Sequence, residues 1–294
     1  MSEPFHGVLP ALTTPFTEDG DAIEAAALRA LVERLVDAGV GGLVPGGSTG
    51  EFTTLTSTER RELIEITVEA AAGRVPVVAG TGALTTRETV ELSIHAEQAG
   101  AAAVMIVPPF YEALSWRELH AHYTAVADAI SIPIMYYNLP GATGVKLSAQ
   151  QLRELPVTSL KDTGGDAVAA TELIQTGGPT LLNGWDTLTF AALAAGVPAV
   201  VWGTASIIPE QCVELHRLLI DDIDLPAARE LWSRIWPLCQ FLERQSYSAA
   251  VKTACRLVGD TTGPVRAPLL ELDDAATRDL SVLVDHARLA EAAR

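Results

Sequence analysis

Lysine is scarce in this chain: twenty positions carry Lys or Arg, and only residues 146, 161 and 252 are lysines. Acidic residues number 37, which leaves a formal net charge of −17. Nucleic acids and anionic membranes bind basic surfaces, so this balance argues against both as partners. A solvated acidic surface is the ordinary interpretation of the charge, and it says nothing about a substrate. Each of the few lysines is a candidate for a specific task.

Cysteine is equally rare, with three in 294 residues. Cys212, Cys239 and Cys255 form no CxxC pair and lie in stretches with a helical pattern, so we expect unpaired thiols in a reducing compartment. Cys212 and His216 have a spacing that can hold a metal ion, but a packed helix face is the simpler interpretation. We therefore predict no metal site.

Long apolar segments and targeting signals are also missing. Residues 1–10 lack the basic region and apolar core that mark a signal peptide. No apolar run approaches the roughly 20 residues that cross a bilayer. The sequence therefore predicts a cytoplasmic protein that does not bind membranes.

What the chain does contain is an alternation of short apolar runs and longer amphipathic segments. Hydrophobic residues make up 48% of the chain, enough for a large core. Most of the runs are nearly continuous in apolar residues, as in parallel strands buried on both faces. Eight strands are expected, at residues 8–13, 42–45, 76–79, 103–107, 133–137, 158–161, 180–182 and 199–202.

The segments between these strands have the pattern of helices packed on a sheet. Leu28, Leu31 and Leu35 belong to an apolar stripe with helical spacing. Four helix starts carry a capping box, in which a hydroxyl residue precedes Glu or Gln by three positions. The boxes are Thr56/Glu59, Thr85/Glu88, Ser115/Glu118 and Ser148/Gln151.

Eight repeats of strand, loop and helix, without a break in composition, fit one closed (β/α)₈ barrel better than an open doubly wound sheet. We assign this α/β barrel to residues 1–222. After it the strands stop, and residues 225–243, 248–258 and 273–290 have helical patterns. They form a C-terminal helical region, residues 223–294, that we expect to pack on the barrel.

Lys161 ends the sixth expected strand, directly before Asp162 and Thr163. Burial at a strand end partly desolvates an ammonium group, and the neutral amine is a nucleophile. An amine that attacks a ketone forms an iminium, which acts as an electron sink when a neighbouring C–C bond forms or breaks. The competing interpretation is a lysine that simply reaches solvent from the strand end.

Residues 46–51, Gly-Gly-Ser-Thr-Gly-Glu, directly follow the second expected strand. Glycines allow the backbone to approach an anion, and the hydroxyls of Ser48 and Thr49 can help to hold a carboxylate. The motif matches neither GxxxxGK[ST] nor GxGxxG, so it does not indicate a nucleotide site. A tight strand-to-helix turn is the alternative interpretation.

Tyr136 and Tyr137 close the fifth expected strand. Because side chains alternate along a strand, one of the two must face the barrel interior. An inward phenol at this end of the strand could move protons beside an iminium, although packing is the usual task of a strand tyrosine.

The candidate residues all lie at or just after strand ends. A (β/α)₈ barrel brings these ends to one face, where such enzymes place their active sites. The candidates that share this face are Ser48, Thr49, Tyr111, Tyr137, Lys161, Asp186 and Thr204.

These motifs resemble those of the dihydrodipicolinate synthase / N-acetylneuraminate lyase family, which are class I, Schiff-base-forming, pyruvate-dependent aldolases. The resemblance covers essentially the whole chain. Its carriers are residues 47–51, 137–140 with Gly144, 160–162 with Gly165, 251–252 and 265–269.

The resemblance implies catalytic roles for four positions. Lys161 would form the Schiff base, Tyr137 would shuttle a proton, and Ser48 would link Tyr137 to Tyr111 in a relay. In the family the tyrosine matching Tyr111 crosses a subunit contact, which implies a homotetramer built from dimers. Lys252 matches a structural position. No metal or organic cofactor is implied, because the lysine imine does the chemistry.

The resemblance also implies substrate-binding positions: Gly47, Thr49, Ala142, Thr163, Asp186 and Thr204. Dihydrodipicolinate synthases carry an arginine where this chain has Ala142, and loss of that carboxylate clamp costs about 1.5–3 kcal/mol of binding. Sialic acid lyases resemble the chain at Asp186, which matches a position that binds sugar hydroxyls, but they carry an acid in place of Thr187. This mixture favours a shorter hydroxylated 2-oxo acid, such as a 2-keto-3-deoxy sugar acid.

Several activities stay open at this point. The first hypothesis is a lyase that forms or cleaves a bond between pyruvate and an aldehyde. Alternatives are 4-hydroxy-tetrahydrodipicolinate synthase, and a dehydratase that uses the same iminium to expel water from a 2-keto-3-deoxy acid. A non-catalytic 2-oxo acid binder is the remaining hypothesis, but simple binding would not need a proton relay.

Overall fold

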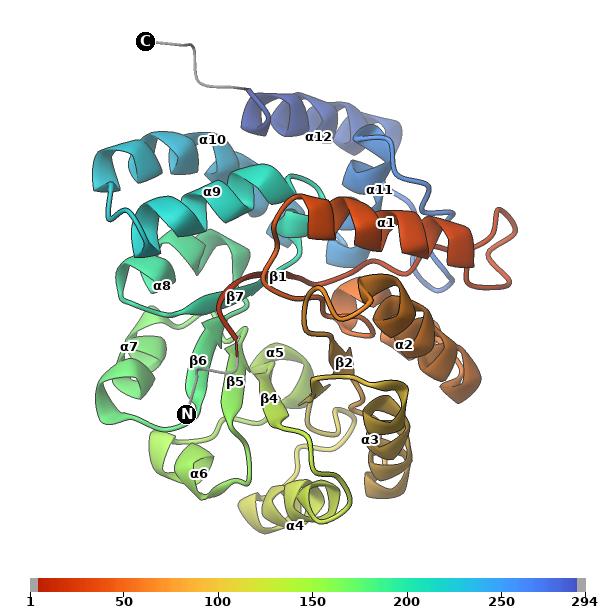
Figure 1. Ribbon diagram of the computed structural model, residues 1–294, viewed down its shortest axis with the longest axis vertical. Helices are drawn as coiled ribbons and strands as arrows, with labels where there is room; N and C mark the ends of the chain where they lie inside the picture. Colours follow the sequence, from red (N-terminus) through yellow and green to blue (C-terminus); the bar gives the residue numbers. More distant parts are fainter. Residues whose placement is uncertain (1–4, 290–294) are drawn as a thin grey trace.

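The computed structural model describes residues 5–289, and its centre is a parallel sheet that curls into a barrel (Figure 1). In this part of the chain, seven strands pair in the order β1-β7-β6-β5-β4-β3-β2. Their bounds are β1 Gly7–Pro10, β2 Val78–Gly80, β3 Ala103–Ile106, β4 Ile134–Asn138, β5 Ser159–Asp162, β6 Thr180–Asn183 and β7 Ala199–Trp202.

A short segment between β1 and β2 closes the barrel. Val44 bridges Ala11, and Leu43 bridges Val77, both in parallel. The second expected strand is therefore present as two isolated bridges instead of a continuous ladder. After this segment the chain turns away from the sheet at Gly46. Glycine readily adopts its φ of +73°, which is strained for residues that carry a Cβ. With this closure, the (β/α)₈ barrel predicted from the sequence is confirmed.

Helices surround the sheet and connect successive strands (Figure 1). Their bounds are α1 Ala25–Asp37, α2 Ser57–Ala71, α3 Thr86–Ala99, α4 Trp116–Ala127, α5 Pro140–Thr143, α6 Ala149–Glu154, α7 Ala167–Thr176, α8 Thr189–Ala194 and α9 Pro209–Ile220. Short 3₁₀ turns are η1 Ser48–Gly50, η2 Phe52–Thr54, η3 Asp186–Leu188 and η4 Thr204–Ser206.

Three of the four expected capping boxes are closed, with hydrogen bonds in both directions. The exception is Thr85, so that part of the expectation was wrong. Thr85 accepts a hydrogen bond from the backbone N–H of Glu88, but the Glu88 carboxylate accepts from the Ser57 hydroxyl at 2.7 Å instead of returning to Thr85. The Ser57 hydroxyl, on the neighbouring helix α2, has thus replaced the backbone N–H of Thr85 as the partner of the Glu88 carboxylate.

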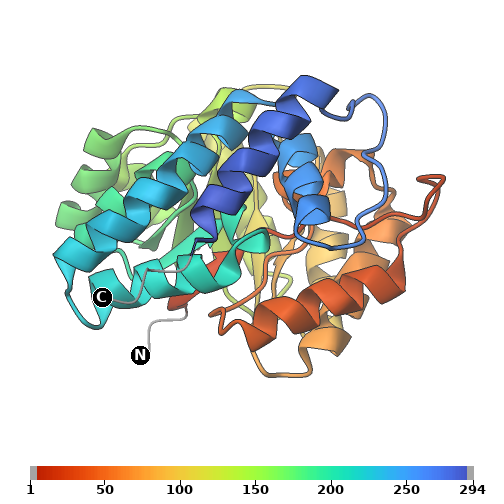
Figure 2. The ribbon, with the colours of Figure 1, turned by 90° about the horizontal axis from the view of Figure 1, so that it is seen from above.

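The C-terminal helices share a core with the barrel and do not form a separate one. They are α10 Leu225–Arg244, α11 Tyr247–Leu257 and α12 Asp274–Ala287. One continuous apolar cluster contains Val8 of β1, Trp202 of β7, Leu238 of α10 and Val284 of α12. Figure 2 shows α10 and α12 side by side over this flank of the barrel. α12 ends at Ala287, and the last residue of the helix expected there lies outside the described range.

Adjacent tyrosines of β4 show how the sheet separates its two faces. Tyr136 packs outward, with its ring centroid 5.4 Å from that of Tyr123 on α4. Tyr137 packs inward with Met105 and Val201 in the cluster that fills the barrel. The predicted alternation is confirmed, and it brings the Tyr137 phenol to the inner face.

The cysteines form no disulfide among the described residues. Cys212, Cys239 and Cys255 are buried free thiols. The Nε2 atom of His216 lies 3.0 Å from the carbonyl oxygen of Pro198, so its ring is engaged with backbone. Within residues 5–289, no three His, Cys, Asp or Glu side chains are grouped as metal ligands would be. None of the helices in this range combines the length and apolar character that crossing a membrane requires.

Candidate active site

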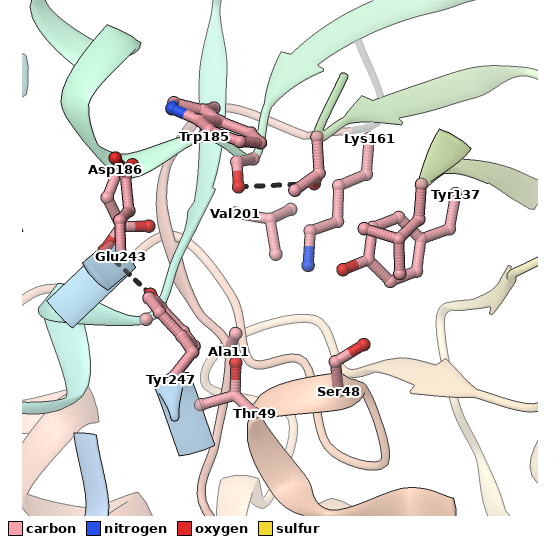
Figure 3. A pocket seen from close by; sticks show the side chains of 14 residues that line it. Ala11, Ser48, Thr49, Tyr137, Lys161, Trp185, Asp186, Val201, Glu243 and Tyr247 are labelled. Atoms are coloured by element: carbon pink, nitrogen blue, oxygen red, sulfur yellow. Dashed lines mark hydrogen bonds between the residues drawn. The ribbon is translucent and has the colours of Figure 1, made fainter. Parts of the chain in front are cut away.

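A cavity of about 240 Å³ opens at the carboxyl ends of the strands (Figure 3). It collects side chains from the barrel interior, from the loops after β1 and β6, and from the helices α10 and α11. The residues that line it are Ala11, Ser48, Thr49, Tyr137, Leu139, Lys161, Thr163, Gly184, Trp185, Asp186, Val201, Gly203, Glu243 and Tyr247.

Lys161 supplies the amine of this cavity. It is the third residue of β5 and faces inward, and only 4% of its surface is exposed. No carboxylate among the described residues lies within ion-pair distance of its Nζ. The neighbouring Asp162 faces the other side of the strand, where its Oδ1 accepts a hydrogen bond from Asn138 at 2.6 Å. The Lys161 amine is therefore available to a ligand in the cavity.

Tyr137 lies opposite Lys161 in the register of β4 and β5. The Lys161 Nζ is 4.1 Å from the centroid of the Tyr137 ring. Figure 3 shows the amine and the phenol hydroxyl pointing into the same part of the cavity. Pairing on adjacent strands thus puts a potential nucleophile beside a group that can give and take a proton.

Ser48 and Thr49 lie on the opposite wall, in a segment that we call the hydroxyl turn (residues 48–51). The predicted contribution of Gly47 is indirect, because it does not line the cavity. A Cβ at Gly47 would lie 3.2 Å from the methyl group of Met105, so glycine lets the turn pack closely on the barrel interior. The turn thus places two hydroxyl residues across the cavity from Lys161 (Figure 3).

Asp186 closes a third side of the cavity. Its Oδ2 accepts hydrogen bonds from Thr204 at 2.6 Å and from Tyr247 at 2.7 Å. Burial raises the pKa of Asp186 to about 6, and the charge of Glu243 acts in the same direction. Thr204 does not line the cavity; it supports Asp186 from behind. Thr163 does line it, and its hydroxyl donates to the carbonyl of Gly184 at 3.2 Å.

Two wall residues from the C-terminal helices were missed by the sequence analysis. Glu243 lies in the last turn of α10, and its carboxylate accepts hydrogen bonds from the backbone N–H and the hydroxyl of Thr187, both at 2.9 Å. Tyr247 begins α11 and donates to Asp186. Neither belongs to a strand-end motif, so no pattern in the sequence points to them. Glu243 thus brings a carboxylate to the cavity wall beside Thr187.

Two of the predicted site residues, Tyr111 and Ala142, lie outside the cavity of their own chain. Tyr111 is 87% exposed and lines a separate hollow with Leu84 and His122. The predicted relay from Tyr137 through Ser48 to Tyr111 is therefore not assembled by a single chain. Ala142 is exposed on α5 and does not line the cavity either.

Comparison with known proteins gives the family. A sequence model of the Dihydrodipicolinate synthetase family matches residues 4–287. The chain belongs to this family. Dihydrodipicolinate synthetase family proteins are lyases of the class I aldolase type with a Schiff-base lysine, so the chain is an enzyme of this type. The family resemblance seen in the sequence is confirmed.

Individual relatives in the family match nearly end to end. A Methanopyrus kandleri protein is 39% identical over 278 residues, 92% of each chain, and a Sorangium cellulosum protein is 39% identical over 285 residues, 95% of this chain and 94% of its own. Both are named 4-hydroxy-tetrahydrodipicolinate synthase. These names favour the synthase alternative over the sugar-acid substrate expected first, and nothing in them points to a sialic-acid-like substrate.

Solved structures of family members superpose closely on the chain. Dihydrodipicolinate synthase from Aquifex aeolicus has a TM-score of 0.91 and 33% identity, and the match covers 96% of this chain and 97% of the other. YagE, a prophage protein of the family from E. coli K12, solved in complex with pyruvate, has a TM-score of 0.92 and 30% identity, covering 97% and 99%. The fold and its C-terminal helices are thus those of the family.

Proposed function

We propose that the chain forms a Schiff base between Lys161 and pyruvate and joins the bound pyruvate to an aldehyde. The observation that carries this proposal is the buried Lys161 amine, which shares one cavity with Tyr137 and the hydroxyl turn. Pyruvate is the ligand of the related YagE structure. No other lysine lines the cavity among the described residues.

The proposed reaction balances without a further reactant. The Lys161 amine attacks the ketone carbon of pyruvate and water leaves, which gives an iminium. Tyr137 donates its proton to the departing hydroxyl group, and the resulting phenolate then takes a proton from the methyl group. The enamine formed in this way attacks the aldehyde carbon to form the C–C bond, and Tyr137 passes its proton to the new alkoxide oxygen. Water finally hydrolyses the iminium and releases the amine. Ser48 and Thr49 are placed to hold the pyruvate carboxylate throughout.

For the aldehyde, the names of the relatives favour aspartate semialdehyde, which would make the chain a 4-hydroxy-tetrahydrodipicolinate synthase. A second candidate is a hydroxylated aldehyde, or the cleavage or dehydration of the matching 2-keto-3-deoxy acid. One observation favours it: Asp186 and Glu243 lie on the cavity wall, and no arginine lines the cavity in the described residues. Carboxylates accept hydrogen bonds from sugar hydroxyls but repel the carboxylate of aspartate semialdehyde.

The proposed chemistry needs no metal or organic cofactor, because the iminium itself accepts the electron pair. We also propose a cytoplasmic location, supported by three buried free thiols. Dialysis against EDTA should leave the turnover rate unchanged, and a loss that Zn²⁺ or Mg²⁺ restores would contradict the proposal.

The decisive test is borohydride reduction in the presence of pyruvate, followed by intact mass and peptide mapping. We expect one adduct per chain, on Lys161, and none in Lys161→Ala with its fold retained by circular dichroism. An adduct elsewhere, or none in the wild-type protein, would refute the mechanism. Turnover of aspartate semialdehyde and of a panel of hydroxyaldehydes with pyruvate then separates the two substrate classes. A non-catalytic binder would show no turnover with any of them.

A further inference from the structure

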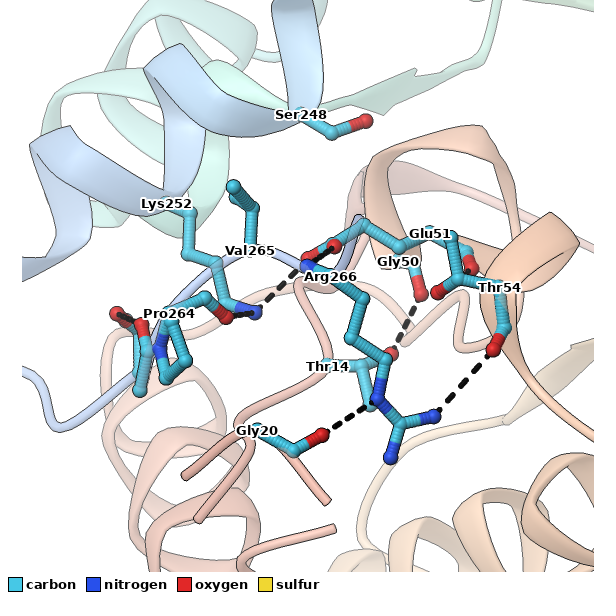
Figure 4. A network of polar contacts seen from close by, with 12 residues as sticks. Thr14, Gly20, Gly50, Glu51, Thr54, Ser248, Lys252, Pro264, Val265 and Arg266 are labelled. Atoms are coloured by element: carbon cyan, nitrogen blue, oxygen red, sulfur yellow. Dashed lines mark hydrogen bonds and ion pairs between the residues drawn. The ribbon is translucent and has the colours of Figure 1, made fainter. Parts of the chain in front are cut away.

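Helix α11 of the C-terminal region contacts both ends of the hydroxyl turn. Figure 4 shows Ser248 and Lys252 on this helix and Glu51 at the end of the turn. The hydroxyl of Ser248 donates to the carbonyl of Ser48 at 2.8 Å. One helical turn further on, the Nζ of Lys252 donates to the Oε1 of Glu51 at 2.8 Å. The helix thereby holds a segment whose two hydroxyl residues line the cavity.

The Glu51 carboxylate and the Lys252 ammonium each make further contacts besides the hydrogen bond that joins them. The Oε2 of Glu51 accepts a hydrogen bond from the backbone N–H of Arg266 at 2.8 Å. The Nζ of Lys252 also donates to the carbonyl of Pro264 at 2.7 Å and lies 4.0 Å from the ring centroid of Phe16. The pair therefore fixes the hydroxyl turn to two segments of the C-terminal region at once.

Glu51 is an unfavourable residue at this place for two independent reasons. Its backbone has φ 56° and ψ 33°, in the left-handed region, where residues with a Cβ are strained. Its side chain and that of Lys252 are fully buried, so both charges lose their hydration. A hydrophobic pair of similar volume would fill the same space without that loss, so packing alone does not account for the charges.

We propose that Glu51 and Lys252 are positioning residues, which hold the hydroxyl turn where Ser48 and Thr49 can bind the carboxylate of a 2-oxo acid. The C-terminal region is then part of the substrate site, although its helices lie outside the barrel. This inference rests on the proposed function, because it takes the ligand carboxylate to lie on the hydroxyl turn.

The double variant Glu51→Gln, Lys252→Met tests the inference. It removes both charges together, so no unpaired buried ion remains, and the Gln side chain keeps an acceptor for the N–H of Arg266. The measurement is cyanoborohydride trapping on Lys161 with pyruvate and with acetone, a ketone without a carboxylate. Displacement of binding groups by about an ångström costs up to roughly a hundredfold, so we expect at least about tenfold more pyruvate at half-maximal trapping. Trapping with acetone should stay within about twofold of wild type, because acetone does not use the turn.

A matched control is the double variant Arg34→Met, Asp260→Asn. Arg34 of α1 and Asp260, just after α11, also form an ion pair between the barrel and the C-terminal region, but a partly exposed one, with the Arg34 Nη2 2.5 Å from the Asp260 Oδ2. This pair does not contact the hydroxyl turn. We expect lower thermal stability but a pyruvate requirement within about twofold of wild type.

Three results would overturn the inference. One is an unchanged pyruvate requirement in the folded Glu51→Gln, Lys252→Met variant, and another is an equal loss with acetone, which would mean general damage. The third is an equal pyruvate effect in the control. If the double variant does not fold, Ser248→Ala removes the other tether from the same helix, and an unchanged pyruvate requirement there overturns the inference instead. A wild-type protein without an adduct refutes the proposed function as well, whereas a normal wild-type adduct confines the failure to the positioning role.

Discussion

Two buried lysines of this chain have opposite surroundings. Lys252 contacts a carboxylate, a backbone carbonyl and an aromatic ring. Lys161 faces a cavity and, among the described residues, has no carboxylate partner; its Nζ lies 4.1 Å from the centroid of the Tyr137 ring. Both side chains are buried, so burial alone does not distinguish a candidate nucleophile from a structural lysine. The contacts that each nitrogen makes do distinguish them. The proposed nucleophile is thus the lysine whose nitrogen is left for a ligand, whereas the nitrogen of Lys252 is already hydrogen-bonded within the protein.

Tyr137→Phe should separate proton transfer from pyruvate capture. The phenyl ring keeps its place beside the amine, but the group that moves the proton is lost, so turnover should fall at least about a hundredfold. The pyruvate concentration for half-maximal trapping should change by less than about threefold. Tyr136→Phe, which removes a hydroxyl from the outward face of the same strand, is the control and should retain turnover. Equal losses in turnover and capture would make Tyr137 a positioning residue.

Asp186→Asn should change how stability depends on pH. Because burial raises the pKa of Asp186 to about 6, the folded state binds its proton more tightly than the unfolded state, whose pKa is near 3.8. Ionisation therefore lowers the free energy of unfolding progressively as pH rises from about 4 to about 6. Relative to wild type, the variant should gain about 2–3 kcal/mol between pH 4 and pH 7. Urea unfolding at both pH values measures this, and a constant difference would show that Asp186 has an ordinary pKa.

At the scale of elements, the sequence predicts the strands well because parallel strands buried on both faces are nearly all apolar. The closing segment around Leu43 and Val44 was predicted as a strand, but its pairing is cut to isolated bridges by the turn at Gly46. The box at Thr85 failed for a different reason, since a neighbouring helix offered Glu88 another partner. Local patterns thus predict the elements, and competition from tertiary contacts explains the exceptions.

Gly80→Ala tests the closure between β2 and this segment. A Cβ at Gly80 would lie 2.2 Å from the carbonyl oxygen of Gly46, which is backbone and cannot rotate away. We expect a loss of about 1–3 kcal/mol in the free energy of unfolding, with weaker pyruvate trapping because the hydroxyl turn begins two residues after Gly46. Gly141→Ala is the control: nothing lies within 4 Å of the added Cβ, so the change should be small or stabilising. An equal effect in both variants would contradict this account.

Much of the cavity was predicted from the expectation that side chains at the carboxyl ends of the strands share one face of the barrel. Lys161, Tyr137 and Asp186 each lie at or after a strand, and the barrel brings strand ends together. Glu243 and Tyr247 could not be predicted this way, because the packing of α10 and α11 on the barrel decides that they reach the cavity. Their sequence positions, at the junction of two helices, carry no signal for it.

At the scale of the whole molecule, Tyr111 is a predicted catalytic residue that one chain leaves outside the cavity. It is 87% exposed beside Leu84, itself 53% exposed, and both line one hollow. An aromatic and an aliphatic side chain exposed together are typical of a contact surface. We propose that a second subunit covers this hollow and receives Tyr111, within the homotetramer that the family resemblance implies.

Mixing two defective variants tests this arrangement. Lys161→Ala and Tyr111→Phe should each be nearly inactive alone. In a mixed dimer, one site combines the intact Lys161 of one subunit with the intact Tyr111 of the other, so random mixing should restore about a quarter of wild-type activity. Refolding the two variants together and assaying turnover measures this. No recovery, despite mixed oligomers in the mass spectrum, would place Tyr111 outside the partner's site.

The pairing of Lys161 with Tyr137 across β4 and β5 has a consequence for how such an enzyme can change. The spacing between two neighbouring strands is set by backbone hydrogen bonds, at about 4.8 Å, and not by any loop. The loop at residues 184–188 and the junction of α10 with α11 can therefore be exchanged or lengthened while Lys161 and Tyr137 keep their separation. Selection or design that alters the aldehyde accepted should act on these outer segments and leave the ladder untouched.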